Sequence, residues 1–367
     1  MSREDAERLA SVLSAHESYV LRRSGGKRAV LRFADLAGLN LTNRRLDEID
    51  LLGANLVGAN LSGSNLDCAS LNCADLSGAR FVNANIRRAD LRGARMDGTV
   101  FDFANLDGGD FRQTRVAVVN GKKKWTVIGG HEITGSVSFA NCSLRSASLR
   151  GANFKDATFH GANLAGANFT HAILGNAIFD GAVLTGMNVA ALPISPDRLK
   201  NCVTDPGQQA VERLPILIAR MQNLELWVIS EGKEGRLETF DNEDIRLLAR
   251  NMRGRKLPGI GLRRTQAVGV DLSGCELQGA NFDGADLRGS KFVGADLRGS
   301  SFRGANLAHA DFSKANVLAL VLNGGSSVET SFEGAELTGV QFAGAQLPPN
   351  TGSGTFADTA RPQLNTP

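Results

Sequence analysis

The sequence predicts an all-β solenoid, a coil of short strands and turns that repeats every five residues. Residues 285–307 read ADLRG SKFVG ADLRG SSFRG ANL. This period matches neither the 3.6 residues of an α-helix nor the two of a β-strand. A large apolar residue stands at the centre of each quintet, alanine usually stands two residues before it, and glycine often follows it. One short strand and one turn per quintet place the large and the small apolar side chains inside.

The quintets form three arrays, with centres from Leu36 to Phe111, from Phe139 to Val189 and from Leu272 to Leu347. Of the 43 centres only Ser327 is not apolar, and 26 of the 43 have alanine two residues earlier. Four such sides close a roughly square coil of 20 residues. Burying four large side chains cannot offset the entropy of ordering 20 residues, so each coil depends on its stacked neighbours.

These A(D/N)LXX quintets resemble the pentapeptide-repeat family, and they cover about 215 of the 367 residues. The resemblance implies a right-handed quadrilateral β-helix, with the centre and the residue two before it inside. Phenylalanine and leucine alternate from Phe282 to Phe312, which places phenylalanines on two opposite sides of the coil. The expected core includes Leu56, Leu61, Leu91, Phe154, Leu164, Phe179, Phe282, Leu287, Phe292, Leu297, Phe302 and Leu307.

Interruptions of the repeat predict helical caps or insertions and a β-hairpin insertion. Near the N-terminus, Leu9, Val12, Leu13, His16 and Val20 have the spacing of an amphipathic helix. The predicted segments are an N-terminal helical cap (1–32), array 1 (33–111), a β-hairpin insertion (112–136), array 2 (137–190), a helical insertion or second cap (191–266), array 3 (267–347) and a C-terminal tail (348–367).

A second helix is predicted over 208–230, with one face formed by Val211, Leu214, Ile218, Met221 and Leu224. Pro215 is expected to kink this helix or to begin a new one.

The two predicted helical segments also end alike, in SYVLRRSGGKRA (18–29) and LWVISEGKEGRL (226–237). We interpret the likeness as an internal duplication, which favours two solenoid modules over 1–190 and 191–367. One continuous rod with a large helical insertion fits the same pattern, and the sequence does not decide between them.

The predicted hairpin carries the strongest candidate for a partner contact. VAVV and WTVI flank Asn120-Gly121, a turn signal, and the tip carries Lys122, Lys123 and Lys124 beside Trp125. Residues 112–136 hold five basic residues and one acidic residue, so the segment has a charge of +4. The tip is either a solvated hairpin or a contact for an acidic partner or a nucleic-acid backbone.

No arrangement of residues predicts catalysis, a metal site or a cofactor. The five histidines lack metal-ligand spacing, and GGK (25–27) and GKEG (232–235) do not match a phosphate-binding loop. The five cysteines also lack metal spacing, and Cys142 and Cys275 are expected to be buried free thiols. Aspartates just before a centre are expected to face solvent, and Arg288 and Arg298 to form surface ion pairs. We therefore predict a non-enzyme without a cofactor.

Two functions remain open. The first is an interaction scaffold, a stiff solenoid whose faces and inserted elements bind other proteins. The alternative is a DNA-gyrase or topoisomerase-interacting protein that acts by DNA mimicry, because some pentapeptide-repeat proteins protect gyrase in this way. A mimic needs a continuous negative face, whereas residues 35–111 carry 11 acidic and 7 basic side chains and residues 270–347 carry 9 and 5. This mixture disfavours mimicry.

The expected partner is a protein of unknown identity. The net charge of +3 does not predict nucleic-acid binding. Because MSREDAERLA lacks the apolar core of a signal peptide and no window approaches 18 apolar residues, we expect a cytoplasmic protein without a membrane partner. Related proteins often pair through a terminal coil, so a homodimer is a candidate state.

Overall fold

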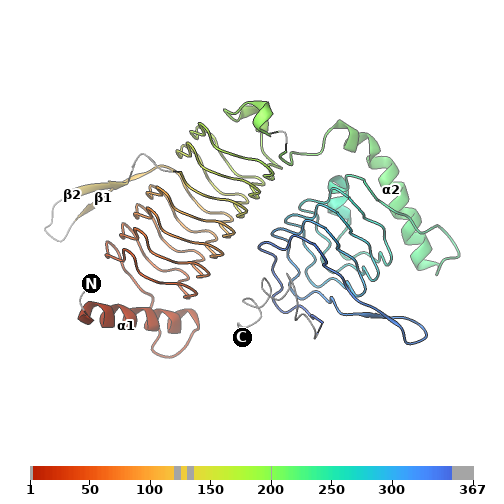
Figure 1. Cartoon of the computed structure of the whole chain (residues 1–367), viewed down its shortest axis with the longest axis horizontal. Coiled ribbons are helices and arrows are strands. Elements are labelled where there is room, and N and C mark those ends of the chain that lie inside the picture. The colour runs from red at the N-terminus through yellow and green to blue at the C-terminus, as the bar shows by residue number, and fades with distance from the viewer. Residues whose placement is uncertain (1–2, 120–124, 130–135, 200, 349–367) are drawn as a thin grey trace. The chain divides into compact units, whose positions relative to one another are not determined.

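The structure is a computed structural model that describes residues 3–119, 125–129, 136–199 and 201–348 (Figure 1). Its elements are α1 (Arg3–Val20), β1 (Arg115–Val119), β2 (Trp125–Gly129), α2 (Gln208–Ile229), β3 (Leu320–Val321), β4 (Ser327–Val328) and the 3-10 turns η1 (Val189–Ala191), η2 (Pro196–Leu199) and η3 (Arg246–Asn251). The chain divides into two compact units, unit 1 (residues 1–205) and unit 2 (residues 206–367). Each unit contains a β-solenoid with its own hydrophobic core.

Each solenoid completes one coil every 20 residues, so residues 20 apart lie side by side in parallel bridges. Asn55 bridges Asp75 in unit 1, and Asp286 bridges Asn306 in unit 2. The N–H of the centre residue Leu56 donates to the carbonyl of Asp75 in the next coil at 2.8 Å. The N–H of Asn55 donates to Ala34 in the previous coil at 2.9 Å. Stacking therefore satisfies backbone groups that a single coil would leave unpaired.

The turn of each quintet depends on the residues around the centre. The residue two after the centre has a positive φ, as at Gly58 (65°), and glycine adopts this left-handed conformation without a steric penalty. The residue just before the centre is often Asn or Asp because its side-chain oxygen accepts the N–H of the residue after the centre. Asn55 Oδ1 accepts from Val57 at 3.2 Å, and Asp75 Oδ1 from Ser77 at 3.0 Å.

The centre residue and the residue two before it fill the axis of each solenoid. The expected core side chains are at most 1% exposed: Leu56, Leu61, Leu91, Phe154, Leu164, Phe179, Phe282, Leu287, Phe292, Leu297, Phe302 and Leu307. The rings of Phe282 and Phe302 stack with centroids 4.7 Å apart, and those of Phe292 and Phe312 stack at 4.6 Å. Alanine leaves room for these rings, and Ala295 is 1% exposed.

The solenoid of unit 2 begins inside the segment that the sequence predicts as a helical insertion (191–266). Thr239 already bridges Gly261, and Phe240 and Ile245 are buried at 0% and 1% exposure. This bridge joins residues 22 apart instead of 20, because the coil contains η3. The two additional residues shift the phase of Phe240 and Ile245, whereas the buried Leu257 and Leu262 keep the phase of array 3 and were missed by the prediction. At the other end of the same segment, Val203 bridges Val183 and so belongs to unit 1.

Array 3 contains an insertion that its regular phase conceals. Ser301 bridges Ser331, 30 residues later instead of 20, and the chain between them forms the β3–β4 hairpin. Leu322, predicted to be a buried centre, is 43% exposed, and Ser327 is also exposed. Because the insertion spans ten residues, or two whole quintets, the later centres stay in phase. The polar centre Ser327 and the Asn323-Gly324 pair, a hairpin turn signal, were its sequence signals.

The hairpin of unit 1 pairs β1 with β2 in antiparallel register, with Arg115 opposite Gly129 and Val119 opposite Trp125. Val100, which precedes the hairpin, bridges Ser138, which follows it. These two residues are 38 apart instead of 20, so the hairpin segment adds 18 residues to the coil. The predicted turn at Asn120-Gly121 lies outside the described residues.

Two leucines at equivalent positions of the sequence repeat are expected to differ sharply in their contribution to stability. Leu297→Ala should lower the free energy of unfolding by about 2–5 kcal/mol, because it opens a cavity in the axis. Leu322→Ala should change it by about 0.5 kcal/mol or less, because Leu322 lies on the exposed hairpin. Urea unfolding followed by far-UV circular dichroism measures both, and equal losses would contradict the position of the hairpin outside the coil.

Two glycines test the packing of the hairpin on its coil. A Cβ at Gly299 would lie 2.7 Å from Leu320 Cβ, whereas a Cβ at Gly294 would meet nothing within 4 Å. Their φ angles are +68° and +65°, so alanine is strained at both positions by about 1–2 kcal/mol. Gly299→Ala should destabilise the protein more than Gly294→Ala, by roughly 1–3 kcal/mol in the same unfolding measurement. Similar losses of stability in the two variants would mean that the β3–β4 hairpin does not pack against Gly299.

Candidate functional site

Helix α2 lies across the first coil of unit 2. Leu217, Met221 and Leu224 are 1%, 5% and 0% exposed, and they join the core cluster that contains Phe240 and Ile245. The helix begins at Gln208 and continues through Pro215, so it does not begin anew at that proline.

The buried face of α2 differs from the predicted one. Val211 and Ile218 were expected beside Met221 and Leu224, but they are 49% and 37% exposed, and Leu217 is buried instead. Apolar residues occur around more than one side of this helix, so their periodicity alone does not select the face that packs.

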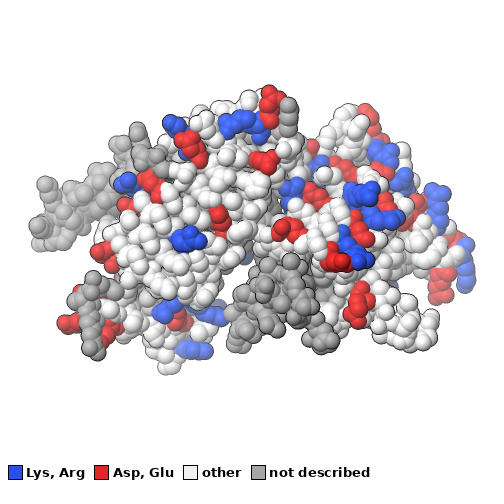
Figure 2. Space-filling model, in the orientation of Figure 1, with Lys and Arg blue, Asp and Glu red and all other residues white. Residues whose placement is uncertain are grey.

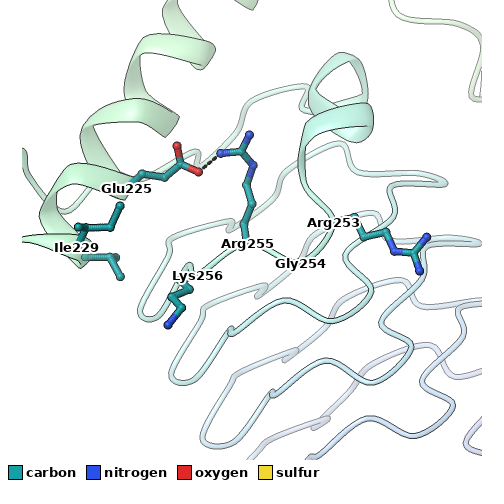
Figure 3. Close-up of a pocket in the computed structure, with 7 residues that line it drawn as sticks. Glu225, Ile229, Arg253, Gly254, Arg255 and Lys256 are labelled. Carbon is teal, nitrogen blue, oxygen red and sulfur yellow. Dashed lines mark ion pairs between the residues drawn. The ribbon is translucent and has the colours of Figure 1, made fainter.

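Charged contacts fix α2 to the coil at two places. The Nε of Arg213 donates to Glu243 at 2.7 Å, and the Nη1 of Arg220 donates to the same carboxylate at 2.9 Å. The hydrogen bond from Arg213 lowers the pKa of Glu243, which is only 8% exposed. Nearer the C-terminal end of the helix, Glu225 pairs with Arg255 of the coil (Figure 3). The helix is therefore held by ion pairs as well as by its buried face.

A pocket of about 520 Å³ separates the C-terminal part of α2 from the coil. Its lining consists of Glu225, Val228, Ile229, Arg253, Gly254, Arg255 and Lys256. Figure 3 shows Ile229 on the helix wall, Lys256 on the coil wall and Arg253 extending along the coil away from α2. Lys256 Nζ lies 3.3 Å from Glu276 Oε1, and its side chain is 66% exposed. With three cations and one carboxylate, the lining carries a net charge of +2.

The exposed large apolar side chains of unit 2 lie outside its coils. They are Val211, Ile216, Ile218, Leu226 and Ile229 on α2, Leu237 in the segment that follows, and Val321, Leu322 and Val328 at the β3–β4 hairpin. Among the coil residues of unit 2 that the structure describes, no large apolar side chain is exposed. Exposed apolar surface in this unit is therefore concentrated on the added elements.

Helix α1 packs on the first coil of unit 1 but presents a different outer surface. Leu13 and His16 are 5% and 0% exposed, and His16 Nδ1 accepts the N–H of Ala29 at 3.0 Å. Burial lowers the pKa of this histidine, which favours the neutral ring. Among the described residues of α1, Tyr19 is the one large apolar side chain that is exposed, and its hydroxyl donates to Glu48 at 3.0 Å.

The coil walls carry charges of both signs in paired arrangements. Arg288 donates to Asp286 at 2.8 and 2.6 Å, so this predicted ion pair is bidentate. Arg298 makes the same contact with Asp296, at 2.9 and 2.6 Å. Figure 2 shows acidic and basic side chains interspersed over the visible surface.

One row of unit 2 alternates in sign from coil to coil: Asp241, Arg263, Asp283, Arg303 and Glu333. Arg263 pairs with Asp241 at 2.9 Å, and Arg303 pairs with Glu333. In unit 1, Arg92 and Arg112 pair with Asp90 and Asp110.

The predicted contact residues belong to unit 1, whereas the pocket belongs to unit 2. Lys122, Lys123 and Lys124 lie outside the described residues, and Trp125 is the first residue of β2, opposite Val119. The sequence pattern did not predict the pocket, because its coil wall falls in the segment expected to be a helical insertion. A signal was available there, since seven basic residues and no acidic residue occur from 246 to 270.

The part of the chain that the structure describes contains no group of three or more His, Cys, Asp or Glu side chains placed to hold a metal ion. None of its helices has the length and apolar character needed to cross a membrane.

Glu243→Gln is expected to weaken the docking of α2. At pH 7 the substitution should lower the free energy of unfolding by about 1–2 kcal/mol, because two arginines lose an ionised acceptor. Since the pKa of Glu243 is depressed in the folded state, the native ion pair stabilises above the unfolded pKa and is lost as pH falls through the folded value. The difference from the variant should therefore shrink below about pH 4.

Glu333→Gln is the control for this prediction, because Glu333 also pairs with an arginine but its side chain is 70% exposed. It should change the free energy of unfolding by about 0.5 kcal/mol or less. Urea unfolding at pH 7 and at acid pH gives both values. A loss for Glu243→Gln that does not depend on pH would contradict the ionic role.

Family models for pentapeptide repeats match residues 45–81, 79–115, 259–293, 268–304 and 280–317, and a second such model matches residues 144–188. No curated protein matches the chain significantly.

Among solved structures, the chain is similar to a trypsin-treated variant of QnrB1, a plasmid-mediated fluoroquinolone resistance protein, with 16% identity over 51% of this chain and 96% of that one and a TM-score of 0.29. HetL, involved in heterocyst differentiation regulation in Nostoc sp. strain PCC 7120, is 20% identical over 89% and 93%, with a TM-score of 0.20. Rfr23 from Cyanothece 51142 is 22% identical over 42% and 88%, with a TM-score of 0.19. On the family matches and its own five-residue coils, the chain belongs to the pentapeptide-repeat family.

Proposed function

We propose that this protein is a non-enzymatic interaction scaffold that binds a protein partner through the elements added to its solenoids. The observation that carries the proposal is the position of the exposed apolar side chains of unit 2. They occur on α2, on the segment after it and on the β3–β4 hairpin, whereas the described coil walls lack them.

The exposed apolar side chains and the paired charges of the coil walls contribute differently to the free energy of binding. Burying an exposed isoleucine or leucine against a partner contributes about 1.5–3 kcal/mol, so a few such residues on one helix form an effective contact. The paired charges of the coil walls contribute little to binding, because each carboxylate is already matched by an arginine of the same wall. The coils therefore serve as a stiff support, and α2 and the hairpin present the contact surface.

The β1–β2 hairpin of unit 1 is a second proposed contact element. Its strands pair in register from Arg115–Gly129 to Val119–Trp125. Lys122, Lys123, Lys124 and Trp125 remain the residues proposed to contact an acidic partner there.

DNA mimicry gains no support from the charges of the described coils. A mimic needs a continuous negative face, but the row through Asp241, Arg263 and Asp283 alternates in sign. In unit 1, Arg88 pairs with Asp67 at 2.5 Å, and other aspartates are paired with arginine in the same manner. The scaffold function is therefore the one that the geometry supports best.

Affinity capture from a lysate of the native host, followed by mass spectrometry, tests the scaffold proposal. The full chain should capture the same partner repeatedly, and Ile218→Glu with Ile229→Glu should lose it, because charges replace the apolar contact. Val57→Glu with Ile173→Glu is the matched control, since those side chains are 40% and 56% exposed on coils of unit 1. All proteins should melt at the same temperature.

The proposal fails if the full chain captures nothing specific, or if the control loses the partner as completely as the α2 variant. Deleting residues 116–130 in parallel measures the contribution of the β1–β2 hairpin. Loss of the partner with an unchanged circular dichroism spectrum would assign part of the contact to that hairpin.

A further inference from the structure

The pocket between α2 and the first coil of unit 2 combines an apolar wall with a cationic wall. We infer that it binds an acidic, amphipathic segment of the protein partner, with apolar side chains against Ile229 and carboxylates on Lys256 and, farther along the coil, on Arg253. The inference rests on the proposed scaffold function and specifies the chemistry of the partner.

The apolar wall continues a stripe along the outer side of α2. Val211, Ile218 and Ile229 are separated by seven and eleven residues, which correspond to about two and three helical turns, so they share one side of the helix. Their exposures are 49%, 37% and 79%. Ile229 is the most exposed large apolar side chain in the described structure, and it lines the pocket. The stripe therefore leads directly to the cationic wall.

The cationic wall comes from four consecutive residues, Arg253, Gly254, Arg255 and Lys256. Arg255 is already neutralised by Glu225, which leaves Arg253 and Lys256 on either side of that ion pair (Figure 3). Arg253 is exposed, and Lys256 makes a 3.3 Å contact with Glu276 in which both side chains are well exposed. Such a pair is worth little, so Lys256 can exchange it for a carboxylate of the partner.

This combination is not a general consequence of placing a helix over the first coil. Helix α1 occupies the corresponding position in unit 1, but Tyr19 is its one exposed large apolar side chain in the described part of the helix. The first turn of α1 carries Glu4 and Asp5, whereas α2 has no acidic residue in its first turn. The apolar stripe therefore distinguishes α2 as a contact surface.

The site fits a protein segment better than a nucleic acid or a lipid surface. Binding to phosphate backbones or anionic membranes depends on many lysines and arginines over a broad surface. Here the lining offers only two cations besides the Glu225–Arg255 pair, and much of the neighbouring surface is apolar. A segment that alternates carboxylates with apolar side chains matches both walls.

Selection of a phage-displayed library of random twelve-residue peptides on the immobilised full chain tests this inference. Peptides should become enriched in Asp or Glu together with Leu, Ile or Phe. Labelled copies should bind about tenfold more weakly to Arg253→Ser with Lys256→Ser, and also to Ile229→Ser, in fluorescence anisotropy. Binding should also weaken as salt increases.

Arg264→Ser with Lys314→Ser is the matched control, because it removes two exposed cations of unit 2 that lie outside the pocket. It should leave peptide affinity unchanged, and all variants should retain the melting temperature of the original chain. Short duplex DNA and phosphatidylserine vesicles are titrated as competing probes.

Peptides without acidic enrichment, or equal losses in both double variants, would overturn the inference. It is also overturned if DNA or vesicles lose affinity on Arg253→Ser with Lys256→Ser while the peptides do not. A native partner that is lost with Ile218→Glu and Ile229→Glu but kept by Arg253→Ser with Lys256→Ser refutes this site alone. Capture of no partner by the unmodified chain refutes the scaffold function instead.

Discussion

The rest of the structure depends on the narrow axis of the coil, which holds one large and one small apolar side chain per side. Phe302 is fully buried, and the small residues Ala295 and Ala305 of the neighbouring quintets are 1% exposed, where a larger residue would overfill the axis. The same geometry brings the backbone of Phe302 within 2.8 Å of Ser331 in the next coil. Side-chain packing and backbone hydrogen bonding therefore support each other, and neither is satisfied by one coil alone.

A chain with this constraint has two places for residues that do not fit the quintet, the ends of a solenoid and loops that leave it. Unit 2 uses both, with α2 at its first coil and the β3–β4 hairpin between Ser301 and Ser331. The coil walls must instead present a turn-forming residue at every corner, which favours Asn, Asp and Gly there. In unit 2 the exposed large apolar side chains are consequently found on the added elements, and the walls carry paired charges such as Arg288 with Asp286, whereas coils of unit 1 also expose Val57 and Ile173.

The sequence predicted the repeat, its inward-facing residues and the presence of interruptions, because each of these is a local pattern. It did not predict how insertions change the coil. Ten residues containing Leu322 and Ser327 preserve the phase, so the insertion was missed. The two additional residues of the coil with η3 break the phase, which hid the strands before η3. The pocket was missed for a different reason, since Glu225 and Arg255 meet only through tertiary packing. The sequence also misassigned Val211 and Ile218 to the buried face of α2.

The ion pairs of α2 explain how an apolar outer face can be maintained on a helix that is apolar on several sides. By packing alone, α2 could rotate to bury Ile218 in place of Leu217 at a modest change in hydrophobic free energy. Rotation would separate Arg213 and Arg220 from Glu243, and would leave a carboxylate that is only 8% exposed without its cations. The charges therefore select one rotation of the helix. Because that rotation is fixed before binding, a partner that contacts Ile218 and Ile229 meets a preorganised surface and loses less entropy on association.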